Sequence, residues 1–211
     1  MDSEKDVDVV EKTTPFQGHF RIDHYRIRHR LFGGDWTTEL SREVFERNHA
    51  AGVLPYDPVS DSLVFVEQFR SGAFAALSSG LYPPGSSPWL VECPAGMIGP
   101  GETPEAVARR EVQEETGCVT RDLVPVCRYL VSPGGASETV FLFCARVSAP
   151  KDGEIHGNVS EDEDIRVKVM PVATAFDRLE RGVFADALTI IALQWFRLNH
   201  GELRRRWTTA P

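Results

Sequence analysis

Short apolar runs separated by turn residues occupy much of the chain and predict β-strands. Residues 16–48 read as two strands around a turn at Gly33-Gly34-Asp35, and the apolar runs 51–56 and 63–69 read as a hairpin joined by DPVSD. Further strands are expected at 89–93, 124–131, 139–146 and 165–170. Three stretches lack this pattern: residues 1–15, which should be loose or an edge, the Gly-, Ser- and Pro-rich loop 71–88, and the acidic loop 150–164.

Helical signals occur in three segments. Thr103 can cap a helix that begins at Pro104, good helix formers follow, and Gly117 suits the left-handed turn past the helix end. Two more helices are expected at 173–181 and 186–199, each followed by glycine. This order of strands and helices predicts an α+β fold in which a mixed β-sheet lies between helices.

The N-terminal part of the chain should form a domain of its own. Residues 1–48 contain few large apolar side chains, so their small β-sheet cannot bury much surface alone and should dock elsewhere. Residues 49–211 contain the apolar runs that a core requires. We therefore expect an N-terminal β domain over 1–48 and a second domain over 49–211.

Charge and composition indicate which kinds of molecule the protein is not expected to bind. A formal net charge of −8 argues against general binding to nucleic-acid phosphates, and the short run 204–206 (RRR) reads as a solvated helix end. No apolar stretch approaches the ~20 residues that span a bilayer, and residues 1–12 are too charged for a secretory signal. The four cysteines lack C-x-x-C spacing, which favours reduced packing residues in a cytoplasmic protein. Neither nucleic acid nor membrane is an expected partner.

The most informative segment is GMIGPGETPEAVARREVQEETGC at 96–118. Its predicted helix places Glu111 and Glu115 on or beside the apolar stripe, and Arg110 can restrain Glu114 through an (i, i+4) pair. A solvated face is the ordinary explanation of glutamates on a helix. It fits poorly here, because the helix dipole disfavours anions near the C-terminal end and unpaired charge on a packing face is costly. A bound Mg²⁺ or Mn²⁺ removes both objections, since hard cations prefer carboxylate oxygens.

Two other polar segments have more than one interpretation. The acidic run 161–164 (EDED) is either a solvated loop or the source of a general base and one further cation ligand. The segment 132–138 (SPGGASE) is either a simple turn or a set of backbone amides offered to a ribose or phosphate.

The segment 96–118 resembles the Nudix box, the signature of hydrolases that act on a nucleoside diphosphate linked to another moiety. Every fixed position of that motif is present, at Gly96, Glu102, Arg110, Glu111, Glu114, Glu115 and Gly117. Cys118 replaces the usual aliphatic residue, a small departure for a buried thiol. Beyond the box, an SPG motif and the segments HYRIRHRLFGG, VEQFR, AGMI and HGNVSEDEDIRV are similar to the ADP-ribose pyrophosphatase family within this superfamily.

The resemblance implies roles for individual residues. Cation ligands would be the Ala95 carbonyl, Glu111, Glu115 and Glu163. The general base would be Asp162 or Glu161, because the family carries glutamate at the position of Asp162. Arg70 would contact the pyrophosphate, which suits a planar guanidinium. The adenosine end would be lined by Arg42, Glu43 and Arg47, with His19 and Phe20 supplied across a dimer interface; the family has phenylalanine at position 19. The terminal ribose would be held by Met97, Ser132, Pro133, Gly134 and Glu138.

The resemblance also implies an activity. It points to Mg²⁺-dependent hydrolysis of ADP-ribose to AMP and ribose 5-phosphate, with Mn²⁺ as an alternative cation, by a homodimer that exchanges its N-terminal domains. Two alternatives stay open: another nucleoside diphosphate sugar as substrate, and a non-catalytic ADP-ribose sensor on the same fold. A sensor would be expected to carry a damaged box, whereas the box here is complete.

Overall fold

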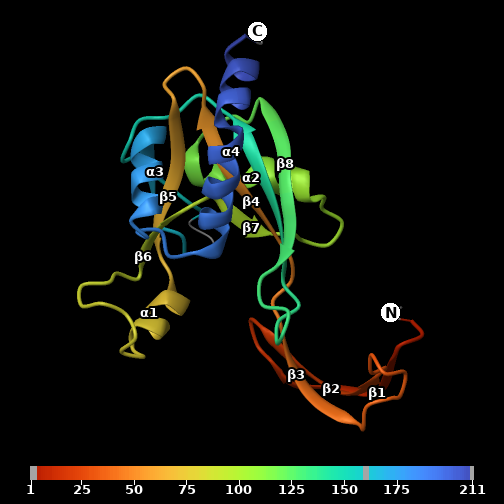
Figure 1. The fold of residues 1–211 in the computed structure, drawn as a ribbon. Helices are drawn as coiled ribbons and strands as arrows, with labels where there is room; N and C mark the ends of the chain where they lie inside the picture. Colours follow the sequence, from red (N-terminus) through yellow and green to blue (C-terminus); the bar gives the residue numbers. More distant parts are fainter. Residues whose placement is uncertain (1–3, 159–161, 210–211) are drawn as a thin grey trace. The chain divides into compact units, whose positions relative to one another are not determined.

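The computed structural model describes residues 4–158 and 162–209 and contains two β-sheets (Figure 1). The chain divides into two units, Met1–His49 with Tyr129–Thr139, and Ala50–Arg128 with Val140–Pro211. The segment that contains SPGGASE therefore belongs with the N-terminal residues, although the sequence alone did not indicate this.

The N-terminal unit is built on an antiparallel three-stranded sheet in the order β1-β2-β3. Its strands are β1 (Val7–Gln17), β2 (Arg21–His29) and β3 (Leu40–Glu46). The two strands predicted within residues 16–48 are confirmed as β2 and β3. The residues expected to be loose or an edge form β1, an edge strand of this sheet.

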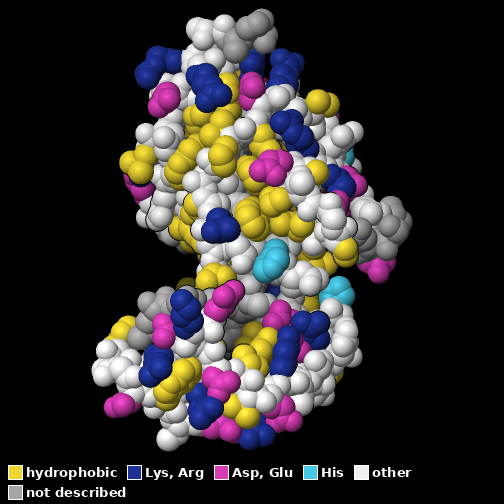
Figure 2. Space-filling model, turned by 90° about the vertical axis from the view of Figure 1, so that its right-hand side faces the viewer, with side chains coloured by type: hydrophobic (Ala, Val, Ile, Leu, Met, Phe, Trp, Pro, Cys, Tyr) yellow, Lys and Arg dark blue, Asp and Glu magenta, His cyan; other side chains and the backbone are white. Residues whose placement is uncertain are grey.

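This unit has almost no buried side chains. Among its described residues only Asp23 and Glu138 are buried, and both are carboxylates. Asp23 accepts a hydrogen bond from Thr14 and pairs with Lys12 and Arg21 at 2.8 and 3.0 Å. Large apolar side chains remain at the surface among charged ones (Figure 2). The sheet therefore has no apolar core of its own within the described residues.

The second unit is built on an eight-stranded mixed sheet. The strand order is β10-β11-β5-β4-β9-β8, with β6 paired to β5 and β7 paired to β4. The strands are β4 (Ala50–Asp57), β5 (Ser62–Phe69), β6 (Trp89–Glu92), β7 (Ala95–Met97), β8 (Asp122–Leu130), β9 (Thr139–Arg146), β10 (Ile155–His156) and β11 (Ile165–Pro171). The predicted hairpin is confirmed, because β4 and β5 pair antiparallel, whereas β4 and β9 pair parallel.

Helices cover both faces of this sheet (Figure 1). The helices of this unit are α1 (Ser71–Leu77), α2 (Pro104–Thr116), α3 (Val172–Glu180) and α4 (Ala187–Thr209), and it is α2, α3 and α4 that pack on the sheet. Val53 and Val64 pack with side chains of α2, whereas Leu54 and Phe65 pack with side chains of α3 and α4. Neighbouring residues of a strand point to opposite faces, so each strand contributes to both apolar layers. The predicted mixed sheet between helices is confirmed.

Two predictions about helices are wrong. Residues 71–77 were expected in a loop but form α1, a short helix without buried residues whose alanines favour helix despite the surrounding glycine and serine. The last helix was expected to end near Asn199, yet α4 continues through Gly201 to Thr209. Burial of Leu203 and Trp207 outweighs the roughly 1 kcal/mol that a glycine costs in a helix interior.

The cysteines form no disulfide. Cys93, Cys118 and Cys144 are buried, as expected for packing residues, whereas Cys127 is exposed, which corrects that expectation at one position. None of the described helices has both the length and the apolar composition needed to cross a membrane.

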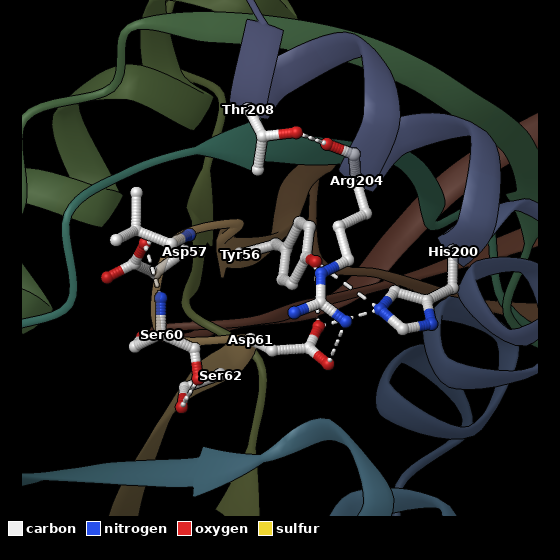
Figure 3. Close-up of polar contacts among 9 residues, drawn as sticks. Tyr56, Asp57, Ser60, Asp61, Ser62, His200, Arg204 and Thr208 are labelled. Atoms are coloured by element: carbon white, nitrogen blue, oxygen red, sulfur yellow. Dashed lines mark hydrogen bonds and ion pairs between the residues drawn. The ribbon is translucent and has the colours of Figure 1, made fainter.

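A polar cluster fastens the C-terminal part of α4 to the turn between β4 and β5 (Figure 3). Asp61 accepts a hydrogen bond from the Tyr56 hydroxyl at 2.8 Å and lies 2.7 Å from Nε2 of His200. Its other carboxylate oxygen is 3.0 Å from Nη1 of Arg204. One carboxylate therefore links two turns of α4 to the sheet.

Replacing Asp61 with asparagine should lower the free energy of unfolding by about 2 kcal/mol at neutral pH, the scale of lost hydrogen bonds to charged partners. Asparagine tolerates the left-handed φ of 52° at this position, so the change removes charge and leaves the backbone in place. Chemical denaturation measures the difference. Glu202→Gln, an exposed change on the same helix, is the matched control and should have little effect.

The same variant should show a characteristic pH dependence. Burial acts to raise the pKa of Asp61, but hydrogen bonds from His200 and Tyr56 and the charge of Arg204 hold it below its ordinary value. A carboxyl whose pKa is lower in the folded state stabilises the protein above its ordinary pKa and stops doing so as the pH falls through the folded value. The two proteins should therefore converge in stability as the pH falls below the lowered pKa of Asp61. An undiminished difference there would contradict the electrostatic account.

Candidate active site

The loop and helix of segment 96–118 form as the local sequence predicts. Thr103 caps α2 by accepting a hydrogen bond from the Ala106 amide at 3.2 Å, and Pro104 occupies the first turn. Gly117 ends the helix with a φ of 69°, a left-handed conformation that suits glycine. Glu102 accepts a hydrogen bond from the Gly99 amide at 2.8 Å and so fixes the preceding loop.

The glutamates of α2 differ sharply in exposure. Glu111 and Glu115 are only 7% and 2% exposed, whereas the Glu114 side chain is 42% exposed. The expected pair between Arg110 and Glu114 is confirmed at 3.0 Å, and the same Arg110 nitrogen lies 2.8 Å from Glu111. Two carboxylates are thus held on the packing face of a helix, where burial of charge is costly.

Strand β7 lies directly against these two carboxylates. The Ala95 amide donates a hydrogen bond to Glu115 at 3.2 Å. At Gly96, an added Cβ would lie 1.8 Å from Oε1 of Glu111, so the Glu111 carboxylate would have to move away from the strand. The glycine therefore allows the strand backbone and this carboxylate to lie close together.

Glu115 interacts with the other predicted cation ligands. Burial raises its pKa well above the ordinary value, and the charges of Glu111 and Glu163 raise it further, against the opposing effect of Arg70 and the Ala95 amide. Glu163 is fixed in turn by the Asn158 amide, which donates to it at 3.0 Å. Within the described residues, no three acidic, histidine or cysteine side chains lie close enough together to form a metal cluster.

The two candidate bases lie beside Glu163 in sequence. Asp162 is exposed and has a φ of 56°, an uncommon backbone conformation for a residue other than glycine. Glu161 lies outside the described residues.

A second group of predicted residues lies in the N-terminal unit. The Phe20 ring meets Phe45 edge to face at 5.1 Å between centroids, and the Arg47 guanidinium lies 5.6 Å from the Phe20 centroid. Arg47 also lies 3.4 Å from Glu138, whose pKa is raised by burial and lowered in part by Arg47. His19 stacks edge to face on Phe20 at 4.6 Å. These residues offer an aromatic face, a cation and a carboxylate in one place.

The other predicted substrate residues are less closely grouped. Ser132, Pro133 and Gly134 lie in an exposed turn, where the Ser132 carbonyl accepts hydrogen bonds from the Gly135 and Ala136 amides at 3.1 and 2.8 Å. The turn interpretation of this segment is therefore observed. On β3, Arg42 and Glu43 are exposed, and Met97 is 48% exposed at the end of β7 in the second unit.

Comparison with known proteins identifies the domain family. The NUDIX domain family matches residues 46–193, which is more than half of the chain. The chain belongs to the Nudix family.

Several relatives of this Nudix protein carry names that describe an activity. A protein of Escherichia coli (strain K12) named ADP-ribose pyrophosphatase is 44% identical, covering 96% of this chain and 93% of that protein. A Haemophilus influenzae protein of the same name is 36% identical, covering 97% and 92%. A GDP-mannose pyrophosphatase of Cronobacter sakazakii is 35% identical over 75% of this chain and 78% of its own length. A solved structure described as an ADP compounds hydrolase has a TM-score of 0.66 at 20% identity, covering 95% and 97%, and supports the fold.

Sequence reasoning missed two acids that interact with Arg70, the buried Glu92 and the partly buried Asp186. Glu92 ends β6 and is 6% exposed, and burial raises its pKa to about 7. Asp186 precedes α4 and accepts a hydrogen bond from the Thr189 amide at 2.8 Å. A glutamate inside the otherwise apolar run WLVEC was the available signal for Glu92, because unpaired charge is rarely placed on a buried strand.

Proposed function

We propose that this Nudix protein hydrolyses ADP-ribose to AMP and ribose 5-phosphate and requires Mg²⁺. The observation that carries the proposal is the buried carboxylate of Glu115, which accepts a hydrogen bond from the Ala95 amide and interacts electrostatically with Glu111, Glu163 and Arg70. Such an arrangement suits a substrate with a diphosphate group, because carboxylates can hold cations beside an arginine that binds phosphate oxygens. The names of the two relatives that match over almost the whole chain support ADP-ribose as the substrate.

The residues present suit a hard divalent cation. Glu111, Glu115 and Glu163 supply carboxylate oxygens, and the backbone at Ala95 supplies a carbonyl. Mutual repulsion and burial raise the pKa of Glu115, so a positive ion held there would relieve both unfavourable effects. When bound, Mg²⁺ or Mn²⁺ would polarise the diphosphate, orient a water molecule and neutralise charge on the leaving phosphate.

The chain's own residues would carry the proton and hold the substrate. Asp162, or Glu161 in its place, accepts a proton from water as the water oxygen bonds to a phosphorus atom and the bond from that phosphorus to the bridging oxygen breaks. Attack at either phosphorus gives the same two products. Arg70 binds the diphosphate. Arg42, Glu43, Arg47, His19 and Phe20 bind the adenosine end, and Met97, Ser132, Pro133, Gly134 and Glu138 bind the terminal ribose.

We further propose a homodimer that exchanges its N-terminal sheets. An unpartnered sheet without an apolar core is marginal in water, and the buried residues described in the N-terminal unit are both carboxylates. A second copy would cover exposed side chains such as Phe16 and Phe32, which are 59% and 100% exposed. The free thiols of all four cysteines are consistent with the cytoplasm, where thiols stay reduced.

A second candidate substrate is GDP-mannose, which the name of the Cronobacter relative favours. The carboxylates of α2 would not distinguish nucleotide sugars, because their proposed role concerns only the diphosphate that all these substrates share. The test is kcat/KM for ADP-ribose, GDP-mannose and UDP-glucose with Mg²⁺, together with identification of the products. We expect ADP-ribose to be preferred by at least about tenfold. Preference for a different nucleotide sugar would overturn the proposed substrate, and binding of ADP-ribose without turnover would indicate a sensor.

A further inference from the structure

Building on the proposed role of Arg70 at the diphosphate, we infer that Glu92 is a positioning residue that holds the Arg70 guanidinium ready for phosphate oxygens. Arg70 Nε donates to Glu92 Oε1 at 2.6 Å. The Glu92 side chain is 8% exposed and the Arg70 side chain is 42% exposed, so the Glu92 carboxylate is buried whereas Arg70 is accessible to solvent. No described residue accepts a hydrogen bond from the two terminal nitrogens of Arg70, which are therefore available to a ligand.

Backbone contacts hold both residues of the pair, Arg70 and Glu92, in place. Arg70 follows β5, and its amide donates to the Pro88 carbonyl at 2.9 Å. Glu92 lies on β6, paired with Val66 of β5 in an antiparallel register. Because neither backbone can shift freely, the hydrogen bond between the side chains determines the direction of the guanidinium plane.

A contact with the start of α4 also helps to fix the position of Glu92. The Cys93 amide donates to Thr189 Oγ1 at 2.8 Å, which ties β6 to the first turn of α4 beside Glu92. Asp186 precedes that turn, and the charge of Arg70 acts favourably on both Asp186 and Glu115. Three carboxylates therefore interact electrostatically with Arg70, and Glu92 is the one that accepts a hydrogen bond from it.

Glu92 is expected to affect the binding of a diphosphate in two opposite ways, by positioning Arg70 and by its own negative charge. The hydrogen bond from Arg70 to Glu92 fixes the guanidinium before the ligand arrives, which reduces the entropy lost on binding. The negative charge of Glu92 weakens the attraction between Arg70 and phosphate. Glutamine at position 92 keeps a carbonyl oxygen that can accept from Arg70 Nε and removes the charge, whereas alanine removes both. The two variants therefore separate the two effects.

The test is a double-mutant cycle read by the Kd of ADP with Mg²⁺ in isothermal titration calorimetry. Glu92→Ala should weaken ADP binding about tenfold when Arg70 is present and less than about twofold in an Arg70→Ala background. Glu92→Gln should stay within about threefold of the unchanged protein, since the acceptor oxygen is kept. Glu67→Ala is the matched control: Glu67 lies on the neighbouring strand and pairs with Arg166 and Lys168 at 3.2 Å.

Three results would overturn the inference. They are an equal loss from Glu92→Ala in both backgrounds, a loss from Glu92→Gln as large as that from Glu92→Ala, and unchanged ADP affinity in Arg70→Ala. Failure of the proposed function gives a different result, because it is judged by turnover of ADP-ribose by the unchanged protein. The binding cycle requires no turnover, so each proposal can fail while the other stands.

Discussion

Replacing Glu115 with glutamine should reduce ADP-ribose turnover by at least about 10²-fold and raise the melting temperature measured without divalent cation. Activity should fall because a neutral amide is a poor ligand for a hard cation. Stability should rise because Glu115 is 2% exposed and lies near Glu111 and Glu163, so the change removes a buried charge among like charges. Each kcal/mol gained raises the melting temperature by about 2–4 °C in a protein of this size.

The experiment is decisive because turnover is expected to fall while the melting temperature rises. Steady-state kinetics and thermal unfolding monitored by circular dichroism give the two values, and added Mg²⁺ should raise the melting temperature of the unchanged protein more than that of the variant. Glu105→Gln is a suitable control, because Glu105 is exposed in the first turn of the same helix. Turnover that survives in Glu115→Gln would remove this residue from the proposed cation site.

Replacing Asp162 with asparagine should reduce kcat by about 10²–10⁴-fold, the range expected when a general base is lost. The change in melting temperature on adding Mg²⁺ should be retained, because the residue is exposed and is not one of the proposed cation ligands. Glu161→Gln provides the comparison, since this neighbour is the other candidate base. The larger loss of kcat identifies the base, and a double variant that keeps more than about a tenth of the turnover would exclude both residues.

The features that the sequence predicted well are those determined by local chemistry. The cap at Thr103, the proline that follows it and the left-handed Gly117 fixed both ends of α2 before the fold was known. Helical periodicity then placed Glu111 and Glu115 on the packing face, where the structure buries them. Continuous apolar runs joined by turn residues likewise located β4 and β5.

The features that the sequence did not predict depend on contacts distant along the chain. Gly201 suggested a helix end, but burial of Trp207 against the sheet carries α4 on to Thr209. The pair between Arg70 and Glu92 joins residues 22 positions apart, and no local pattern specifies it. For the same reason the sequence did not assign residues 129–139 to the N-terminal unit.

The long final helix has a practical consequence for anyone who shortens this protein. Its last ten residues, 200–209, look dispensable because they are rich in arginine and include a glycine, a residue typical of helix ends. Deleting them would remove Leu203 and Trp207 from the interior and take His200 and Arg204 away from Asp61. The remaining protein would have a hole in its largest apolar cluster and an acid without its counter-charges, so a purification tag should follow this helix rather than replace any part of it.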